Sequence, residues 1–221
     1  MDWIRNYQLF LFDFDGLLVN TEEIHYEAYK MMCQQRGHHL TWDFPTYCSI
    51  AHYSSDGLQH RTYATLPKLH AEEPDWKVLY QEKKEAYLEL LKRGAVKLMP
   101  GAVDLLQALE KAHIKRAVVT HSLGELILAI RKQNPILDTI PHWITREHYS
   151  QPKPSPECYN FAIETLAKAS DRVIGFEDTP RGLQALLGTR AVPVLVASIA
   201  YPEIPDFVAK GVKHIPSLHD F

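Results

Sequence analysis

The sequence is poor in cysteine and has no long apolar run, and each absence excludes a class of protein. Its 221 residues include three cysteines, Cys33, Cys48 and Cys158, and none belongs to a CxxC pair. Such scattered thiols indicate neither a disulfide framework nor a zinc cluster. They favour the reducing cytoplasm as the location of the protein. No apolar stretch approaches the length that spans a bilayer. We also expect no secretory signal, because acids interrupt the short apolar run near the first residue.

A strong excess of charge is also missing. The formal net charge is −3, with 46% hydrophobic and 23% charged residues. Such a chain has no general basic field to attract nucleic acid or an acidic membrane, so we expect neither partner. The apolar fraction is sufficient for a buried core. An anionic ligand would need local positive charge.

Short apolar runs alternate with amphipathic segments over most of the chain. The apolar runs predict buried strands, and the segments between them have the spacing of helices. This alternation is typical of βαβ units, and it predicts an α/β fold with a Rossmann-like parallel sheet covered by helices on both faces. The expected strands are residues 7–12, 114–120, 142–145, 172–178 and 192–197. The expected helices among them are residues 102–113, 123–134, 155–169 and 179–190.

Residues from about 20 to 93 interrupt this alternation and predict no strand. A helix is expected from Asn20, a candidate cap, to a stop at Gly37, and an amphipathic helix over 74–94. Between them, residues 40–73 are polar, aromatic and rich in histidine, without clear periodicity. We therefore expect a helical insertion after the first strand. The predicted domains are a core of residues 1–17 and 96–221 and a helical cap of residues 18–95.

Acids, hydroxyls and one lysine gather where the expected strands end. The carboxyl ends of strands in an open parallel sheet meet at one edge, and ligands bind there. Convergence of several polar side chains at that edge indicates a ligand site more specifically than any single motif does. The side chains expected there are Asp13, Asp15, Thr120, His121, Ser122, Lys153, Glu177 and Asp178.

The acids of this edge indicate a metal site. Without a counter-ion, Asp13, Glu177 and Asp178 would raise one another's pKa. A hard divalent cation with oxygen ligands would stabilise them, and Mg²⁺ is the usual choice beside phosphate. One aspartate can then attack phosphorus, while Asp15 serves as acid and base. Gly16 lets the backbone turn tightly after the first strand.

Four segments together resemble the haloacid dehalogenase superfamily. They are "DFDGLLVNT", "VVTHS", "KPSP" and "GFEDTPRG", and they occur in the family's order over most of the chain. The chain is most similar to the subfamily with a helical cap after strand one, which contains beta-phosphoglucomutase and phosphoglycolate phosphatase. The resemblance implies a phosphoryl-transfer enzyme.

The resemblance also implies a role for each matching residue. Asp13 is expected to be the nucleophile that forms an aspartyl-phosphate, and Asp15 the general acid and base. Thr120 is expected to donate its hydroxyl to the transferring phosphoryl group. Lys153 is expected to neutralise and orient Asp13 and the phosphoryl oxygens. These are the components that in-line phosphoryl transfer requires.

The implied metal is Mg²⁺, and other residues are candidates for substrate binding. The expected ligands are Asp13, Asp15 through its backbone carbonyl, Glu177 and Asp178. His121 and Ser122 follow the second strand and are candidates to touch substrate, although a structural role for His121 is an equal alternative. His25 either reaches the active site from the cap or lines a helix face.

Departures from the family pattern restrict the reaction. Superfamily dehalogenases lack the second aspartate, so Asp15 argues against dehalogenation. Sugar phosphomutases share His25, but they carry a glycine-led cap loop with an arginine for the second phosphate. Here Ala51 takes the expected glycine position, and no arginine follows it in this stretch until Arg61. Leu123 stands where mutases have a lysine. The missing cations weaken the mutase interpretation.

Three functions remain open from the sequence. The leading hypothesis is a Mg²⁺-dependent phosphatase for a small soluble phosphomonoester, with specificity set by His25 and cap loops around 44–62. The second is a sugar phosphomutase of the beta-phosphoglucomutase type, and the third is a non-catalytic protein that binds a phosphorylated ligand. The partner expected in each case is a small phosphorylated metabolite. The sequence leaves the substrate and the oligomeric state open.

Overall fold

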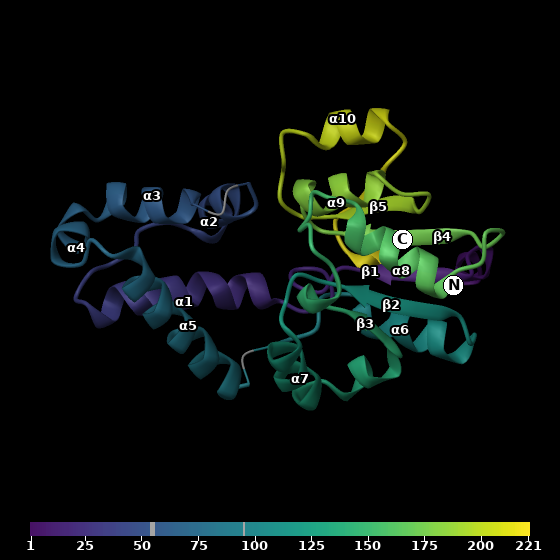
Figure 1. Cartoon of the computed structure of the whole chain (residues 1–221), viewed down its shortest axis with the longest axis horizontal. Coiled ribbons are helices and arrows are strands. Elements are labelled where there is room, and N and C mark those ends of the chain that lie inside the picture. Colours follow the sequence, from purple (N-terminus) through teal and green to yellow (C-terminus); the bar gives the residue numbers. More distant parts are fainter. Residues whose placement is uncertain (54–55, 95) are drawn as a thin grey trace. The chain divides into compact units, whose positions relative to one another are not determined.

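The chain forms two compact units. Unit 1 comprises residues 1–20 and 97–221, and unit 2 comprises residues 21–96. Unit 2 therefore follows the first strand as an insertion into the sequence of unit 1 (Figure 1). The computed structural model describes residues 1–53, 56–94 and 96–221.

Unit 1 is built on a six-stranded sheet whose pairings are all parallel. The strands are β1 (Leu9–Phe12), β2 (Lys115–Val119), β3 (His142–Ile144), β4 (Val173–Glu177), β5 (Val192–Val196) and β6 (Lys213–Ile215). Their order is β3-β2-β1-β4-β5-β6, so β1 lies between β2 and β4. The predicted α/β parallel sheet is confirmed. The short strand β6 was not predicted.

Helices connect the strands of unit 1. The α-helices are α6 (Ala102–Lys111), α7 (Gly124–Gln133), α8 (Glu157–Leu166), α9 (Pro180–Leu187) and α10 (Ile204–Ala209). The 3-10 helices are η1 (Asp2–Asn6), η2 (Pro135–Thr139), η3 (Arg146–His148) and η4 (Leu218–Asp220). The chain leaves β1 toward β2 and β3, and later returns to pair β4 with the other side of β1. A sheet of this kind has its switch point beside the first strand, where ligands bind at the carboxyl ends.

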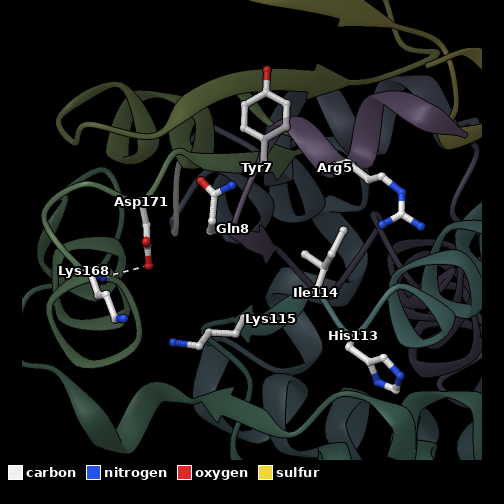
Figure 2. A pocket seen from close by; sticks show the side chains of 8 residues that line it. All are labelled: Arg5, Tyr7, Gln8, His113, Ile114, Lys115, Lys168 and Asp171. Atoms are coloured by element: carbon white, nitrogen blue, oxygen red, sulfur yellow. Dashed lines mark hydrogen bonds between the residues drawn. The ribbon is translucent and has the colours of Figure 1, made fainter.

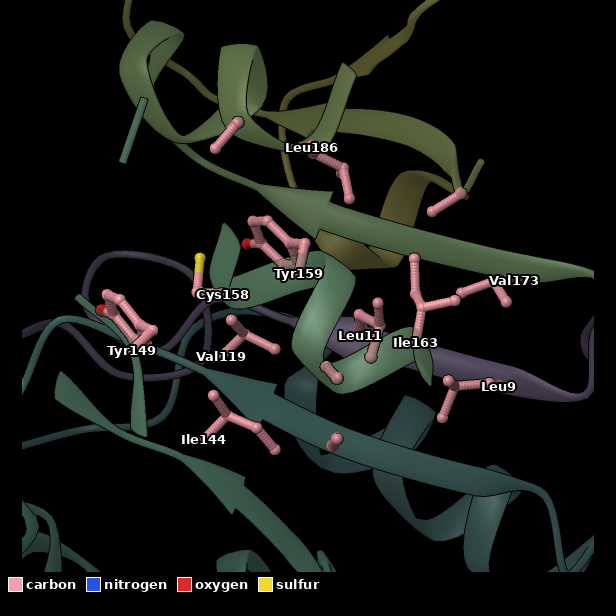
Figure 3. Close-up of a cluster of buried hydrophobic side chains, with 14 residues drawn as sticks. Leu9, Leu11, Val119, Ile144, Tyr149, Cys158, Tyr159, Ile163, Val173 and Leu186 are labelled. Atoms are coloured by element: carbon pink, nitrogen blue, oxygen red, sulfur yellow. The ribbon is translucent and has the colours of Figure 1, made fainter. Parts of the chain in front are cut away.

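One face of the sheet packs on α8 and α9. Successive side chains of a strand point to opposite faces, and Leu9 and Leu11 of β1 point toward these two helices (Figure 3). They meet Tyr159 and Ile163 of α8 and Leu186 of α9 in one buried cluster. Burial of such side chains contributes about 1.5–3 kcal/mol each, and it fixes the loop before α8 close to the end of β1.

The opposite face carries an aromatic layer. Phe10 and Phe12 of β1 stack on Phe176 of β4, with ring centroids 6.1 and 5.2 Å apart. Trp3 and Phe221, from the two ends of the chain, extend this layer through contacts with Phe10 and Phe176. The central strands are therefore buried on both faces, as expected for a parallel sheet.

The described residues of unit 2 form helices joined by turns and loops, with no strand among them. Its helices are α1 (Thr21–Gln35), α2 (Phe44–Ala51), α3 (Gly57–Thr65), α4 (Pro67–Glu72) and α5 (Trp76–Lys92). Helices α1 and α5 pack against each other. Gly37 has a φ of 76° and ends the turn after α1, as predicted.

The segment of residues 40–73 is more regular than the sequence indicated. The loops expected around 44–62 are in large part the helices α2 and α3, and α4 follows them. Residues 54 and 55 of this segment lie outside the described residues. Each helix is too short to show a periodic apolar stripe, and local capping supports them instead. The Asp43 carboxylate, for example, accepts the Thr46 N–H at 2.9 Å. In the part of the chain that the structure describes, no helix is long and apolar enough to cross a bilayer.

Candidate active site

The ends of the central strands bring the predicted acids together. Asp13 follows β1, and its N–H donates to the Phe176 carbonyl of β4 at 3.0 Å. Phe12 pairs with Phe176 in the β1–β4 register, so Asp13 and Glu177 follow the same pair of residues. Oxygens of Asp13, Glu177 and Asp178 lie within 4.8 Å of one another, and all three residues are buried. The structure therefore places these three acids at one point.

Lys153 is the cation of this cluster. Its amine donates to Asp13 Oδ1 and, at 2.7 Å, to Glu177 Oε1. It also donates to the Val119 carbonyl at 3.0 Å. Only 6% of the residue is exposed. A buried ammonium of this kind requires charged or hydrogen-bonding partners, and it has them in Asp13 after β1, Val119 of β2 and Glu177 of β4.

Charge and burial shift the pKa values of this pair. Burial raises the pKa of Asp13 to about 8; Lys153 opposes that shift, while Glu177 and Asp15 add to it. Burial alone would lower the pKa of Lys153, but the charges of Asp13 and Glu177 outweigh it and hold that pKa well above its usual value. The cluster therefore carries more negative charge than one lysine neutralises.

Asp15 points to a different set of donors. Its Oδ2 accepts the Ser122 hydroxyl at 2.6 Å and the Thr120 hydroxyl at 3.2 Å. The Ser122 N–H in turn donates to Thr120 Oγ1 at 3.0 Å. Gly16 follows with a φ of 79°, and its N–H donates to the Val19 carbonyl at 2.8 Å, which closes the tight turn. The structure thus joins Asp15, Thr120 and Ser122 in one hydrogen-bonded group.

His121 contacts the lysine loop. The Lys153 backbone N–H donates to its Nε2 at 2.8 Å, so this nitrogen is an acceptor without a proton. Burial, together with the nearby charges of Lys153, Arg181 and Arg146, lowers the pKa of His121 to about 3. This neutral ring holds the loop of Lys153. Its predicted contact with substrate stays a prediction.

His25 belongs to unit 2 and has partners there. Its Nδ1 lies 2.8 Å from the amine of Lys83, and its ring stacks on Tyr87 at 4.1 Å between centroids. Lys83 is buried, although the helical pattern of α5 predicted an apolar stripe and gave no sign of it. The role of His25 at a substrate stays a prediction.

Two tyrosines of the site were missed in the sequence. The Tyr159 hydroxyl donates to Glu177 Oε1, beside Lys153. The Tyr149 hydroxyl donates to the Thr120 carbonyl at 2.9 Å. Tyr159 lies in the buried stripe of α8, where a tyrosine needs a polar partner for its hydroxyl. That requirement is the one sequence signal that could have indicated it.

The donor set fits a hard divalent cation. Carboxylate oxygens are its preferred ligands, and the three buried carboxyl groups, once ionised, carry more charge than one ammonium neutralises. Glu177 is the most constrained member: 1% of it is exposed, and Oε1 already accepts Lys153 and Tyr159. Its Oε2 packs over Gly182 of α9, where an added Cβ would lie 2.0 Å away. One oxygen of Glu177 is therefore already bound to two donors of the protein.

Comparison with known proteins places the chain in a family. A family model described as haloacid dehalogenase-like hydrolase matches residues 10–191. The chain is similar to protein CbbY of Rhodobacter capsulatus, with 25% identity over 94% of this chain and 97% of that protein. It is also similar to a phosphorylated carbohydrates phosphatase of Thermotoga maritima, with 26% identity over 79% of this chain and 78% of that protein.

A solved structure shows the same fold. It is that of a CbbY variant from Rhodobacter sphaeroides in complex with xylulose 1,5-bisphosphate. The TM-score is 0.72 at 22% identity, and the match covers 96% of this chain and 95% of that one. The match includes both the sheet and the helical insertion.

Proposed function

The chain belongs to the haloacid dehalogenase-like hydrolase family, and we propose that it hydrolyses a small phosphomonoester, such as a sugar phosphate, through an aspartyl-phosphate. The expected resemblance to this family and the expected hydrolase class are confirmed by the match over residues 10–191. The observation that carries the proposal is the Lys153 amine on Asp13, with the Asp15 carboxylate held beside it by two hydroxyls.

In the first step, a carboxylate oxygen of Asp13 attacks phosphorus. The bond between phosphorus and the leaving oxygen breaks, and Asp15 gives a proton to the alkoxide. Lys153 keeps Asp13 oriented and offsets the charge of the phosphoryl oxygens. In the second step, water attacks the same phosphorus, Asp15 takes its proton, and inorganic phosphate leaves Asp13. Thr120 and Ser122 orient Asp15 throughout, because both hydroxyls donate to its Oδ2.

Mg²⁺ is the proposed cofactor. Asp13 and Asp178 would hold it, with Glu177 directly or through water and with the Asp15 carbonyl. When bound, it neutralises phosphate oxygens and the acids of the cluster. The raised pKa of Asp13 supports this assignment, since the buried acids lack sufficient positive charge of their own.

The relatives support the proposed substrate class. The Thermotoga relative is named a phosphatase of phosphorylated carbohydrates, and the CbbY structure contains a sugar bisphosphate. We propose that unit 2 acts as the cap that selects the substrate. The three cysteines are free and buried, which suits the reducing cytoplasm that we propose as its location.

The test is a phosphate-release screen over a panel of sugar and polyol phosphates with Mg²⁺. Asp13→Asn should reduce release about a thousandfold or more, because an amide cannot serve as the nucleophile. Asp206→Asn, at an exposed position of α10, is the matched control and should retain full activity. Full activity of Asp13→Asn would overturn the mechanism.

The same screen separates the rival functions. A mutase would convert one sugar phosphate into its isomer without releasing inorganic phosphate. A non-catalytic binder would turn over no member of the panel, and beryllofluoride with Mg²⁺, which mimics the aspartyl-phosphate, would not raise its melting temperature. The phosphatase proposal requires phosphate release and a higher melting temperature.

A further inference from the structure

A pocket lies at the opposite edge of the sheet from the acids. It has a volume of about 380 Å³ and is lined by the segment before β1, the turn before β2 and the loop before β4. We call it the basal pocket; Figure 2 shows the side chains that line it. This edge holds the amino ends of the three central strands, which the proposed phosphatase reaction does not use.

The basal pocket is rich in cations. Arg5, Lys115 and Lys168 line it, and Asp171 is the one carboxylate among the lining residues. Asp171 Oδ2 is engaged, since it accepts the Lys168 N–H at 2.9 Å. The Lys115 amine donates to the Leu166 carbonyl at 2.9 Å and keeps two further N–H groups. This local positive charge stands out in a chain whose net charge is −3.

The cations occupy two separate ends of the pocket. Lys115 and Lys168 extend at one end, beside Asp171, whereas Arg5 and His113 lie at the other (Figure 2). Ile114 lies between the two ends and gives an apolar surface. A ligand that fills this space would carry negative charge at both ends and a less polar middle.

His113 gives a second and independent indication. Its φ is 54°, and it is the one non-glycine residue with positive φ in the described ranges, where glycines hold the other positions. It follows α6: its N–H bonds to the Glu110 carbonyl and the next N–H to the Leu109 carbonyl, each at 3.0 Å. Glycine is the usual residue at this position of such a turn. A non-glycine residue kept in this backbone conformation at the rim of a pocket makes its side chain a candidate for ligand binding.

We propose that the basal pocket binds a small elongated organic dianion, with phosphate or carboxylate groups at its two ends. Lys115 and Lys168 bind one end. Arg5 binds the other, where His113 donates an N–H. The site is separate from the acidic cluster, so its occupant is a second ligand of the enzyme in addition to the substrate.

The test uses probes that the enzyme cannot hydrolyse. Metal-free protein of residues 1–221 is titrated with α,ω-alkane diphosphonates of three to six carbons and followed by amide NMR shifts. We expect saturable shifts at residues 5–8, 113–115 and 168–171. Hexylphosphonate has one charged end and loses one set of charge-assisted hydrogen bonds. It should therefore bind more weakly by a factor of about ten or more.

Variants assign the binding to named side chains. Arg5→Gln and Lys168→Gln should each weaken binding about tenfold. Lys210→Gln, at an exposed position after α10, is the matched control and should bind as the unaltered protein does. His113→Gly should weaken binding while it leaves the melting temperature equal or higher, since glycine adopts this backbone conformation without strain. If His113 had only a structural role, His113→Gly would bind the probe as the unaltered protein does and would have a lower melting temperature.

Three outcomes would overturn the proposal. The first is an absence of shifts at millimolar probe, or shifts confined to residues 13–15 and 120–122. The second is equal binding by hexylphosphonate or by the Arg5 and Lys168 variants. The third is a concentration-dependent shift of the same amides without any probe, which would show that a second copy of the chain covers the pocket.

Discussion

The Lys153 amine lies 2.7 Å from Glu177 Oε1, and both residues are buried at the end of β4. The same amine reaches Asp13, so one cation stabilises two acids that would otherwise repel each other. Removal of one partner of a buried ion pair leaves the other charge uncompensated, and this is more costly than the pair is stabilising.

Lys153→Met should therefore lower the free energy of unfolding by about 3–5 kcal/mol. Phosphate release should fall with it, because Asp13 loses its positioning partner. Chemical denaturation measures the first effect. Lys210→Met, an exposed control, should change stability by no more than about 0.5 kcal/mol. Equal stability of the two variants would contradict the buried ion pair.

Tyr159→Phe tests the hydroxyl that donates to Glu177. The ring stays in the apolar cluster of α8, so the change removes one hydrogen bond to a charged group. We expect the free energy of unfolding to fall by about 1.5–3 kcal/mol, and phosphate release to fall as Glu177 loses a fixed orientation. Denaturation and kinetics measure both. Tyr7→Phe is the control, and a similar effect there would show that Tyr159 has no special role.

Gly182→Ala tests the support beneath Glu177. The new Cβ would lie 2.0 Å from Oε2, so the carboxylate must move. We expect weaker Mg²⁺ binding and a lower turnover number, measured by calorimetry and phosphate release. Gly124→Ala, in α7, is the matched control: its nearest contact would be Glu147 at 3.9 Å. Unchanged metal affinity in Gly182→Ala would show that Glu177 adjusts without loss.

Mg²⁺ affinity should depend on pH below about 8. The pKa of Asp13 is raised to about 8, so in metal-free protein this group holds a proton below that value. A metal must displace the proton, and its affinity should weaken up to about tenfold for each pH unit below 8. Calorimetry at pH 6, 7 and 8 measures the trend. Asp13→Asn should abolish it, and a slope that persists in this variant would assign the proton to another group.

Lys83 predicts a pH dependence of stability in unit 2. Burial lowers its pKa from 10.5 to about 8; Glu22 opposes the shift and Lys84 adds to it. Between pH 8 and pH 10.5 the unfolded chain holds a proton on Lys83 that the folded chain has released. The free energy of unfolding therefore rises with pH across this range. At pH 7 the burial of the charge costs about 3 kcal/mol.

Lys83→Met should remove this rise. The difference in unfolding free energy between unaltered protein and variant, measured from pH 7 to 10, isolates the effect from other groups. Lys84→Met, on the exposed side of the same helix, should keep the rise. A constant difference for Lys83→Met across the range would show that Lys83 titrates near its ordinary value.

The central strands of the sheet could be predicted from the sequence for a physical reason. Strands β1, β2 and β4 are buried on both faces, so they form continuous apolar runs, and acids or hydroxyls mark the point where each run ends. Helices α2 to α4 were missed because each is too short for a periodic stripe. Strand β6, Lys213–Ile215, was missed because two of its three residues are polar.

Partners of the site residues were harder to predict than the residues themselves. Lys153 and Asp13 stand in motifs, but Tyr159 meets Glu177 only because α8 packs on β1 and β2. The burial of Lys83 could not be predicted for a similar reason. Its burial depends on His25 from α1 and on the surrounding tyrosines, which supply hydrogen-bonding and cation–π contacts that no spacing within α5 reveals.

The two chain segments that join the units are paired with each other. Val19 and Leu98 form an antiparallel bridge, and the Asn20 N–H donates to the Lys97 carbonyl at 3.0 Å. The ends of the insertion therefore already meet within unit 1. A tight turn from Asn20 to Lys97 would close the chain without residues 21–96 and leave the order of the six strands intact. Such a minimal protein would separate the phosphoryl-transfer chemistry proposed for unit 1 from the substrate selection proposed for unit 2 in a single deletion.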